Sequence, residues 1–428
     1  MFVRRSILIT KTRHKVAINF NEDLKHRCKH RTPSVHKPPY LEAFSLSGPQ
    51  MIMQDKDLIS MLLIFASFLF QSTVAFTSQH AVTYGLSKPF LPSSTTLLST
   101  TAFDILKDST VINPTTGVTC KALDSVIQEK NNPLAFLENF FGPDMLYTLV
   151  VVMPQLGDFD SAEYAEMLAA VQDDLKKAKI ALRVIGIGDE VSAKKFSGFH
   201  GLSLDVIRMD KTGTLHKSLN LHSGPDWDVP SFTPTPILEW FSDYVGAKGE
   251  NRDIQAIARS WLNYMAMCAG IAAPDTLPEI LRGYFGDKEA PERIKSDSVV
   301  TVGNKEDPFI KITGVKDVKL GPFKYEQLWK NESGYQRPVE LATARLRVMV
   351  EVLTNFGEYV PDQRFLDLRG ATFLFNHNDD NELLYEHIDT GVLAYSKTMR
   401  RPLSYLVPYI GEKALNPLGL GDQAAAKQ

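Results

Sequence analysis

Cysteine is scarce in this chain, which has three of them, Cys28, Cys120 and Cys268, among 428 residues. They are odd in number and far apart, so they can build neither a disulfide scaffold nor a zinc site made of cysteines. A surplus of charge is also lacking, because 47 Lys and Arg stand against 50 Asp and Glu. This balance gives no overall attraction to nucleic acid, and we expect no nucleic-acid partner.

The remaining composition is typical of a globular protein, with 44% hydrophobic and 23% charged residues. These proportions exclude disordered, collagen-like and multi-span membrane proteins. At roughly 150 residues per domain, the length suits two or three folded units. The apolar run at residues 58–70 is too short to span a bilayer as a mature anchor, so we expect no transmembrane helix in the mature protein.

The N-terminal hundred residues differ from the rest. The first 50 are rich in Lys, Arg and His without apolar periodicity. We therefore predict that residues 1–57 are unstructured or an extension of the gene model, with the true start at Met51, Met53 or Met61.

Residues 58–105 are predicted to be a signal peptide followed by a transit peptide. The apolar run is followed by a cleavage-like Thr73-Val74-Ala75, then by Phe76 and a stretch rich in Ser and Thr without an acidic residue before Asp104. This order resembles the two-part plastid presequence of diatoms and related algae, and it predicts a plastid location. A signal peptide with a disordered secreted linker is the alternative.

An alternation of strands and helices begins after about residue 106. Residues 148–153 are a continuous apolar run, as in a strand buried on both faces of a sheet, and a helix pattern begins at Asp160. Further along, the pattern predicts strands at 180–185 and 204–209 and helices at 192–199 and 214–219. Such alternation indicates a layered α/β sheet.

The alternation stops between residues 222 and 336, which we predict to be a mainly helical insertion. Prolines at 230, 234 and 236 mark a loop, helices are expected at 254–270 and 276–285, and a charged stretch of low complexity follows. The second α/β part, 337–410, holds an amphipathic helix at 337–356 and a hairpin of strands 371–375 and 383–388. Residues 411–428 are predicted to be a flexible tail.

Two blocks resemble the AhpC/TSA peroxiredoxin-like family of the thioredoxin-like superfamily, and in particular its plastid and cyanobacterial branch. The first, residues 150–221, contains the turn Pro-Gln-Leu-Gly-Asp-Phe-Asp-Ser and the strand end Ile-Gly-Ile-Gly-Asp. The second contains Arg369-Gly-Ala-Thr-Phe-Leu-Phe and Leu-Tyr-Glu-His-Ile-Asp. The resemblance implies an α/β, thioredoxin-like three-layer sheet formed by 106–221 and 337–410. It also implies peroxide reduction by a cysteine thiolate after the first central strand.

The thiol turn departs from that family. Where related proteins have Gly-Cys-x-x-Cys, this chain has Gly157, Asp158 and Ser161 at the glycine and the two thiol positions. Oxygen groups form neither a sulfenic acid nor a disulfide. We expect Asp158, Asp160 and Ser161 to cap the following helix; a cation site or general base would need further ligands that the sequence does not show. No metal or cofactor is therefore expected.

Arg369 corresponds by resemblance to the arginine that orients peroxide beside the thiolate. Without a thiolate, the prediction for it is an ion pair with Asp158 or Asp160.

A displaced cysteine is the remaining source of a thiol. Cys120 is expected on an edge strand, and Cys268 near the end of a helix, where the dipole raises a thiol pKa and methionine neighbours favour core packing. The scattered histidines, which have no ligand spacing, are expected at the surface or on a sheet face: His200, His216, His222, His377 and His387.

Two functions stay open. The first is a plastid binding or assembly factor without thiol catalysis, in a redox or photosynthetic context, whose insertion docks a protein partner or a membrane surface through Trp, Met and Tyr of residues 254–285. The second is an antioxidant enzyme in which Cys268 or a partner's cysteine supplies the thiol.

Overall fold

The central strands form from the most apolar runs of the chain. β3 (Tyr147–Gln155) and β4 (Ile180–Ile187) are buried along almost their whole length, which explains why their sequences do not alternate between apolar and polar residues. They pair in parallel, and β4 pairs in parallel with β5 (Ile207–Met209). The predicted strands are confirmed, except that residues 204–206 form a short 3-10 helix, η1 (Leu204–Val206), before β5.

A seven-stranded mixed sheet surrounds this centre, in the order β13-β12-β3-β4-β5-β1-β2. β12 (Ala371–Asn376) runs antiparallel to β3 and to β13 (Glu382–Ile388), as the predicted hairpin requires. The opposite edge is the antiparallel pair of β1 (Thr110–Ile112) and β2 (Thr119–Lys121). The pairing of β12 with β3 brings residues from the two ends of the folded part side by side.

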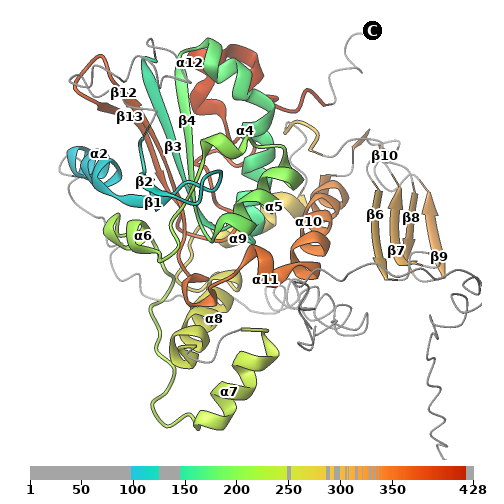
Figure 1. Cartoon of the computed structure of the whole chain (residues 1–428). Coiled ribbons are helices and arrows are strands. Elements are labelled where there is room, and N and C mark those ends of the chain that lie inside the picture. Colours follow the sequence, from blue (N-terminus) through green and yellow to red (C-terminus); the bar gives the residue numbers. More distant parts are fainter. Residues whose placement is uncertain are drawn as a thin grey trace, which may run out of the picture. The chain divides into compact units, whose positions relative to one another are not determined.

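Helices cover both faces of the sheet (Figure 1). Leu149, Val151 and Met153 of β3 join a core cluster with residues of α4 (Phe159–Lys177), α5 (Glu190–His200) and α10 (Arg337–Thr354). The alternate residues Val150 and Val152 join a second cluster with α2 (Leu98–Asp108) and α6 (Thr214–Ser218). The three layers confirm the α/β class and are consistent with a thioredoxin-like fold.

The structure describes residues 98–124, 145–247, 252–285, 290–293, 299–303, 306, 308–313, 317–320, 322–326, 330–331, 334–335 and 337–420. All of them belong to the unit Met53–Gln428. The predicted extension 1–57 and the presequence up to residue 97 lie outside the described residues.

Two predicted boundaries change. The predicted limit at 105/106 falls inside α2, whose Ala102, Phe103 and Leu106 are buried, so the folded part begins before residue 106. The predicted tail begins with the 3-10 helix η4 (Gly411–Ala414), and Ala414 is fully buried in the main core. Residues 411–420 therefore belong to the fold.

The insertion, residues 222–336, contains the predicted helices α8 (Ile254–Cys268) and α9 (Thr276–Phe285). It also contains α7 (Thr235–Tyr244), where the prolines predicted only a loop. Pro236 lies in the first turn of α7, where a missing N–H costs no helical hydrogen bond.

A second difference is the charged stretch, which forms a four-stranded antiparallel sheet instead of irregular chain. Its strands are β6 (Val299–Gly303), β7 (Pro308–Thr313), β8 (Asp317–Leu320) and β9 (Phe323–Glu326). The alternation of Ile310, Lys311 and Ile312 is the period-two signal that the charges concealed. The short elements that complete the chain are β10 (Lys330–Asn331), β11 (Gly334–Tyr335), α11 (Phe356–Tyr359), η2 (Gln363–Phe365), η3 (Ser404–Leu406) and α12 (Val407–Ile410).

Candidate functional site

The turn between β3 and α4 is held by close packing. A side chain at Gly157 would lie 2.6 Å from Cγ2 of Val360, so a larger residue there would have to displace its neighbours. Asp158 directly precedes the first residue of α4, and its N–H donates to the Gln155 carbonyl at 2.9 Å. The predicted cap, Asp160, is instead the second residue of the helix, and its side chain lies outside the described residues.

Arg369, which precedes β12, forms an ion pair with Asp158, which follows the neighbouring strand β3. Nη1 of the guanidinium donates to Oδ2 of the carboxylate, and both side chains are buried. This confirms the predicted pairing of Arg369 with the residue at the first thiol position. The backbone N–H of Arg369 donates to the carbonyl of His222 at 2.8 Å, which fixes the loop before β12 to the first residue of the insertion.

Asp389 adds a second carboxyl group to this pair. It directly follows β13, and its N–H donates to the Gly370 carbonyl at 3.0 Å. Burial raises the pKa of Asp389 to about 7, while the charge of Arg369 lowers it and that of Asp158 raises it again. A side chain at Gly370 would clash with the carbonyl oxygen of Val152 and would lie 2.8 Å from Oδ2 of Asp389, so the close approach of both groups favours glycine at that position.

Asp389 is not among the predicted site residues, although its position follows from the hairpin. Ala371 pairs with Ile388, so the residues before β12 and after β13 lie together at one end of the two strands. The carboxyl end of β3 reaches the same place, because Ala371 also pairs with Val152.

Ser161, at the second thiol position, faces a small buried cavity. Its side chain is 2% exposed, and its hydroxyl has no hydrogen-bond partner within the described part of the chain. The predicted capping by this hydroxyl is therefore wrong. The cavity is also lined by Tyr164, Thr372, Asp389 and Tyr395, and its volume of about 10 Å³ is the room that one water molecule needs.

The insertion covers this end of the sheet. The hydroxyl of Thr390 donates to the carboxylate of Asp275, and the N–H of Val392 donates to the hydroxyl of Thr276 at 2.8 Å. On the other side, Nε2 of His222 hydrogen bonds to the carbonyl of Ala272 at 2.7 Å. Burial lowers the pKa of His222, the carbonyl of Ala272 raises it, and the charge of Arg369 lowers it. The charged cluster Asp158, Arg369 and Asp389 is thus enclosed.

The two described cysteines lie outside this cluster. Cys120 is on β2 at the far edge of the sheet, as expected. Four strand spacings separate β2 from β3, or roughly 19 Å, so Cys120 cannot reach the Gly157 turn. Burial and Asp124 raise the pKa of its thiol, and the charge of Arg208 lowers it. Cys268 is the last residue of α8, half-buried and packed against the main core, which confirms the packing prediction.

Three of the histidines expected at the surface or on a sheet face, His200, His216 and His387, are buried and lie beside carboxylates. Nε2 of His387 lies 3.4 Å from Oδ1 of Asp389. Nδ1 of His216 lies 3.0 Å from Oδ2 of Asp210, and its Nε2 lies 2.7 Å from the carbonyl of Met153. Nδ1 of His200 lies 3.1 Å from Oε1 of Glu166. Within the described residues, no group of three or more His, Cys, Asp and Glu is arranged to hold a metal.

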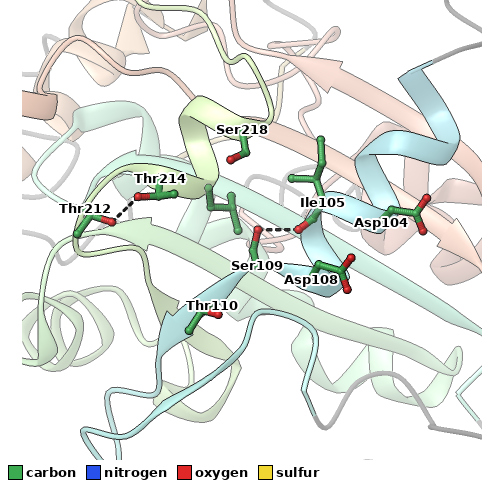
Figure 2. Close-up of a pocket in the computed structure, with 9 residues that line it drawn as sticks. Asp104, Ile105, Asp108, Ser109, Thr110, Thr212, Thr214 and Ser218 are labelled. Carbon is green, nitrogen blue, oxygen red and sulfur yellow. Dashed lines mark hydrogen bonds between the residues drawn. The ribbon is translucent and has the colours of Figure 1, made fainter.

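A larger pocket lies elsewhere, between α2, β1 and α6 (Figure 2), with a volume of about 620 Å³. Its wall carries the carboxylates of Asp104 and Asp108 and several hydroxyl groups, without a cysteine or histidine. The hydroxyl of Ser109 donates to the Ile105 carbonyl at 2.6 Å, and those of Thr212 and Thr214 bond to each other at 2.7 Å. Three of its hydroxyls are thus already engaged, and the pocket shows no activated nucleophile.

A comparison with protein-family models finds a match to the AhpC/TSA antioxidant enzyme model over residues 167–391, more than half of the chain. The match begins inside α4, after the Gly157 turn, and includes Arg369 and Asp389. No match is found among curated proteins or among solved structures. No helix of the described residues has the length and apolar character needed to cross a membrane.

Proposed function

We propose, since the chain belongs to the AhpC/TSA antioxidant enzyme family, that it is a peroxiredoxin-like protein that acts by binding and has no thiol catalysis. The observation that carries this proposal is the buried ion pair of Asp158 and Arg369. The carboxylate stands where the resemblance places the reactive thiolate, and it engages the arginine that would orient peroxide.

The chemistry of the other groups supports the same proposal. Neither Asp158 nor Ser161 can be oxidised by peroxide to a sulfenic acid. The insertion covers the cluster through Asp275 and Thr276, so a bulky substrate has no open approach from that side. We expect the buried ion pair to hold the conformation of the turn, because breaking a buried pair is strongly destabilising. Neither a carboxylate nor a guanidinium group gives the turn a redox activity.

A thiol peroxidase that uses Cys268 is the second candidate. The observation that favours it is position: Cys268 ends α8, and the loop that follows leads to Asp275 beside Thr390. Its place at a helix C-terminus argues against a reactive thiolate, because the negative end of the dipole disfavours the charged form.

One experiment distinguishes the two candidate functions. The purified protein, starting at residue 76, is treated with hydrogen peroxide and a sulfenic-acid trap, together with Cys268→Ser and the matched control Cys120→Ser. We expect no trapping at Cys268 and no thiol-dependent peroxide turnover. Turnover that is lost in Cys268→Ser and retained in Cys120→Ser would refute the binding function and establish the second candidate.

We further propose a plastid location, in a redox or photosynthetic context, on the composition of residues 58–105. A reporter fused to residues 51–105 is expected to enter the plastid, and a Phe76→Ala version tests the junction. Secretion of the unaltered fusion would overturn this location.

A further inference from the structure

Exposed apolar side chains gather on and beside α7. Phe232, Ile237, Trp240 and Tyr244 are 85%, 52%, 63% and 54% exposed. We call these four residues the α7 surface. The predicted docking residues lie elsewhere and are mostly covered: Tyr264 and Met267 are buried, and Trp261 and Met265 pack against the main core.

Three of the four residues of the α7 surface lie on one face of the helix. Ile237, Trp240 and Tyr244 follow one another at helical spacings of three and four residues, so they point to the same side. The rings of Trp240 and Tyr244 stack with their centroids 5.5 Å apart. This arrangement presents a continuous aromatic and aliphatic stripe, the kind of surface that monomeric soluble proteins use for binding.

The other side of α7 holds the stripe in place. Leu238 and Ser242 are buried, and the ring of Phe241 packs edge-to-face against Trp261 of α8 at 6.3 Å. The α7 surface is thus pre-ordered before a partner arrives, which lowers the entropic cost of binding.

The charges around the stripe select its partner. Residues 222–247 contain no Lys or Arg, but they contain four acids: Asp226, Asp228, Glu239 and Asp243. Arg259 pairs with Asp226 and Asp228, and Arg252 pairs with Asp243, so two guanidinium groups face three of these four carboxylates. The negative surplus disfavours an anionic membrane surface and favours a partner with positive charge beside its apolar face.

We propose that the α7 surface binds an amphipathic helix of a partner protein whose apolar stripe is bordered by Lys or Arg. The proposal rests on the binding function proposed above. Trp240 and Tyr244 are the anchors, because large aromatic side chains carry most of the energy in such contacts.

The test uses a synthetic amphipathic helix of Leu and Lys as the probe and a peptide with Glu in place of Lys as its charge control. The protein variants are Trp240→Ser and, as a control, Val118→Ser; Val118 is 62% exposed and directly precedes β2. We expect Trp240→Ser to weaken binding of the Lys peptide at least about tenfold, as for loss of an anchor, and Val118→Ser to leave it unchanged. Unchanged circular dichroism of both variants shows that they are folded.

Several results would overturn the proposal: equal binding of the Lys and Glu peptides, or no effect of Trp240→Ser. Sedimentation that shows a dimer lost in Trp240→Ser would assign the surface to a second copy of the chain. Trp240-dependent binding to phosphatidylcholine or phosphatidylserine vesicles would assign it to a membrane. Peroxide turnover through Cys268 would refute the proposed function and is measured without the peptide, so the two failures are distinguishable.

Discussion

Asp389→Asn tests the enclosed charge cluster most directly. Asp389 is 4% exposed, and the pKa of its carboxyl group is raised from 3.8 to about 7 on folding. At about 1.4 kcal/mol per pKa unit, this difference corresponds to about 4 kcal/mol. Asn has nearly the same shape as the protonated acid, so the variant removes the charge and keeps the packing.

The raised pKa determines how the stability of the protein changes with pH. The folded protein holds the proton more tightly than the unfolded chain, so the stabilisation from the protonated group is complete below pH 3.8 and is lost as the pH rises through about 7. Asn cannot ionise. The variant should therefore match the natural protein at pH 4 and exceed its free energy of unfolding by up to about 4 kcal/mol at pH 8.

The assay is urea unfolding between pH 4 and pH 8, with Asp104→Asn as the control for an exposed carboxylate. The difference between Asp389→Asn and the natural protein should grow with pH, whereas the difference for Asp104→Asn should stay nearly constant. A difference that does not depend on pH, or a variant that is less stable at pH 8, would refute the assignment of a buried carboxyl that ionises near neutral pH.

Three further predictions concern the same turn. Arg369→Met should destabilise the protein by about 3–5 kcal/mol in denaturant unfolding, because it leaves a buried charge unpaired, and adding Asp158→Asn should recover part of that loss; equal stability of the single and double variants would contradict the ion pair. Asp158→Cys should give a thiol with a pKa below the usual value of about 8.5, measured by the pH dependence of alkylation, because it stands beside Arg369 and before α4; a normal or raised pKa would contradict this electrostatic description. Gly157→Ala should cost about 1–3 kcal/mol through its clash with Val360, whereas Gly198→Ala, which has open space inside α5, should stabilise the helix by up to about 1 kcal/mol; thermal unfolding of the pair checks this, and similar effects of both changes would refute it.

Much of the central fold could be predicted because its signals are local. The runs that became β3 and β4 are apolar throughout, and the helices α4, α8 and α10 carry their apolar residues at helical spacing. The pair of Arg369 with Asp158 was also predictable, once the resemblance had placed both residues at one end of the sheet.

Other features depend on context that one sequence does not display. Proline is common both in loops and in the first turn of a helix. Pro234 and Pro236 therefore gave no signal that could separate the start of α7 from a loop. The raised pKa of Asp389 arises from burial under segments far apart in the chain, and the isolated hydroxyl of Ser161 arises from the shape of its cavity. The early start of α2 was missed because its first residues, Leu-Ser-Thr-Thr, continue the composition of the stretch before it.

The hydrogen bonds that join residues 222–336 to the ends of β12 and β13 have a consequence for the engineering of this chain. The carbonyl of His222 accepts from the N–H of Arg369, and the hydroxyl of Thr276 accepts from the N–H of Val392. Excising residues 222–336 would therefore remove acceptors from two backbone donors at the site itself. A shortened domain would need other acceptors for these two N–H groups.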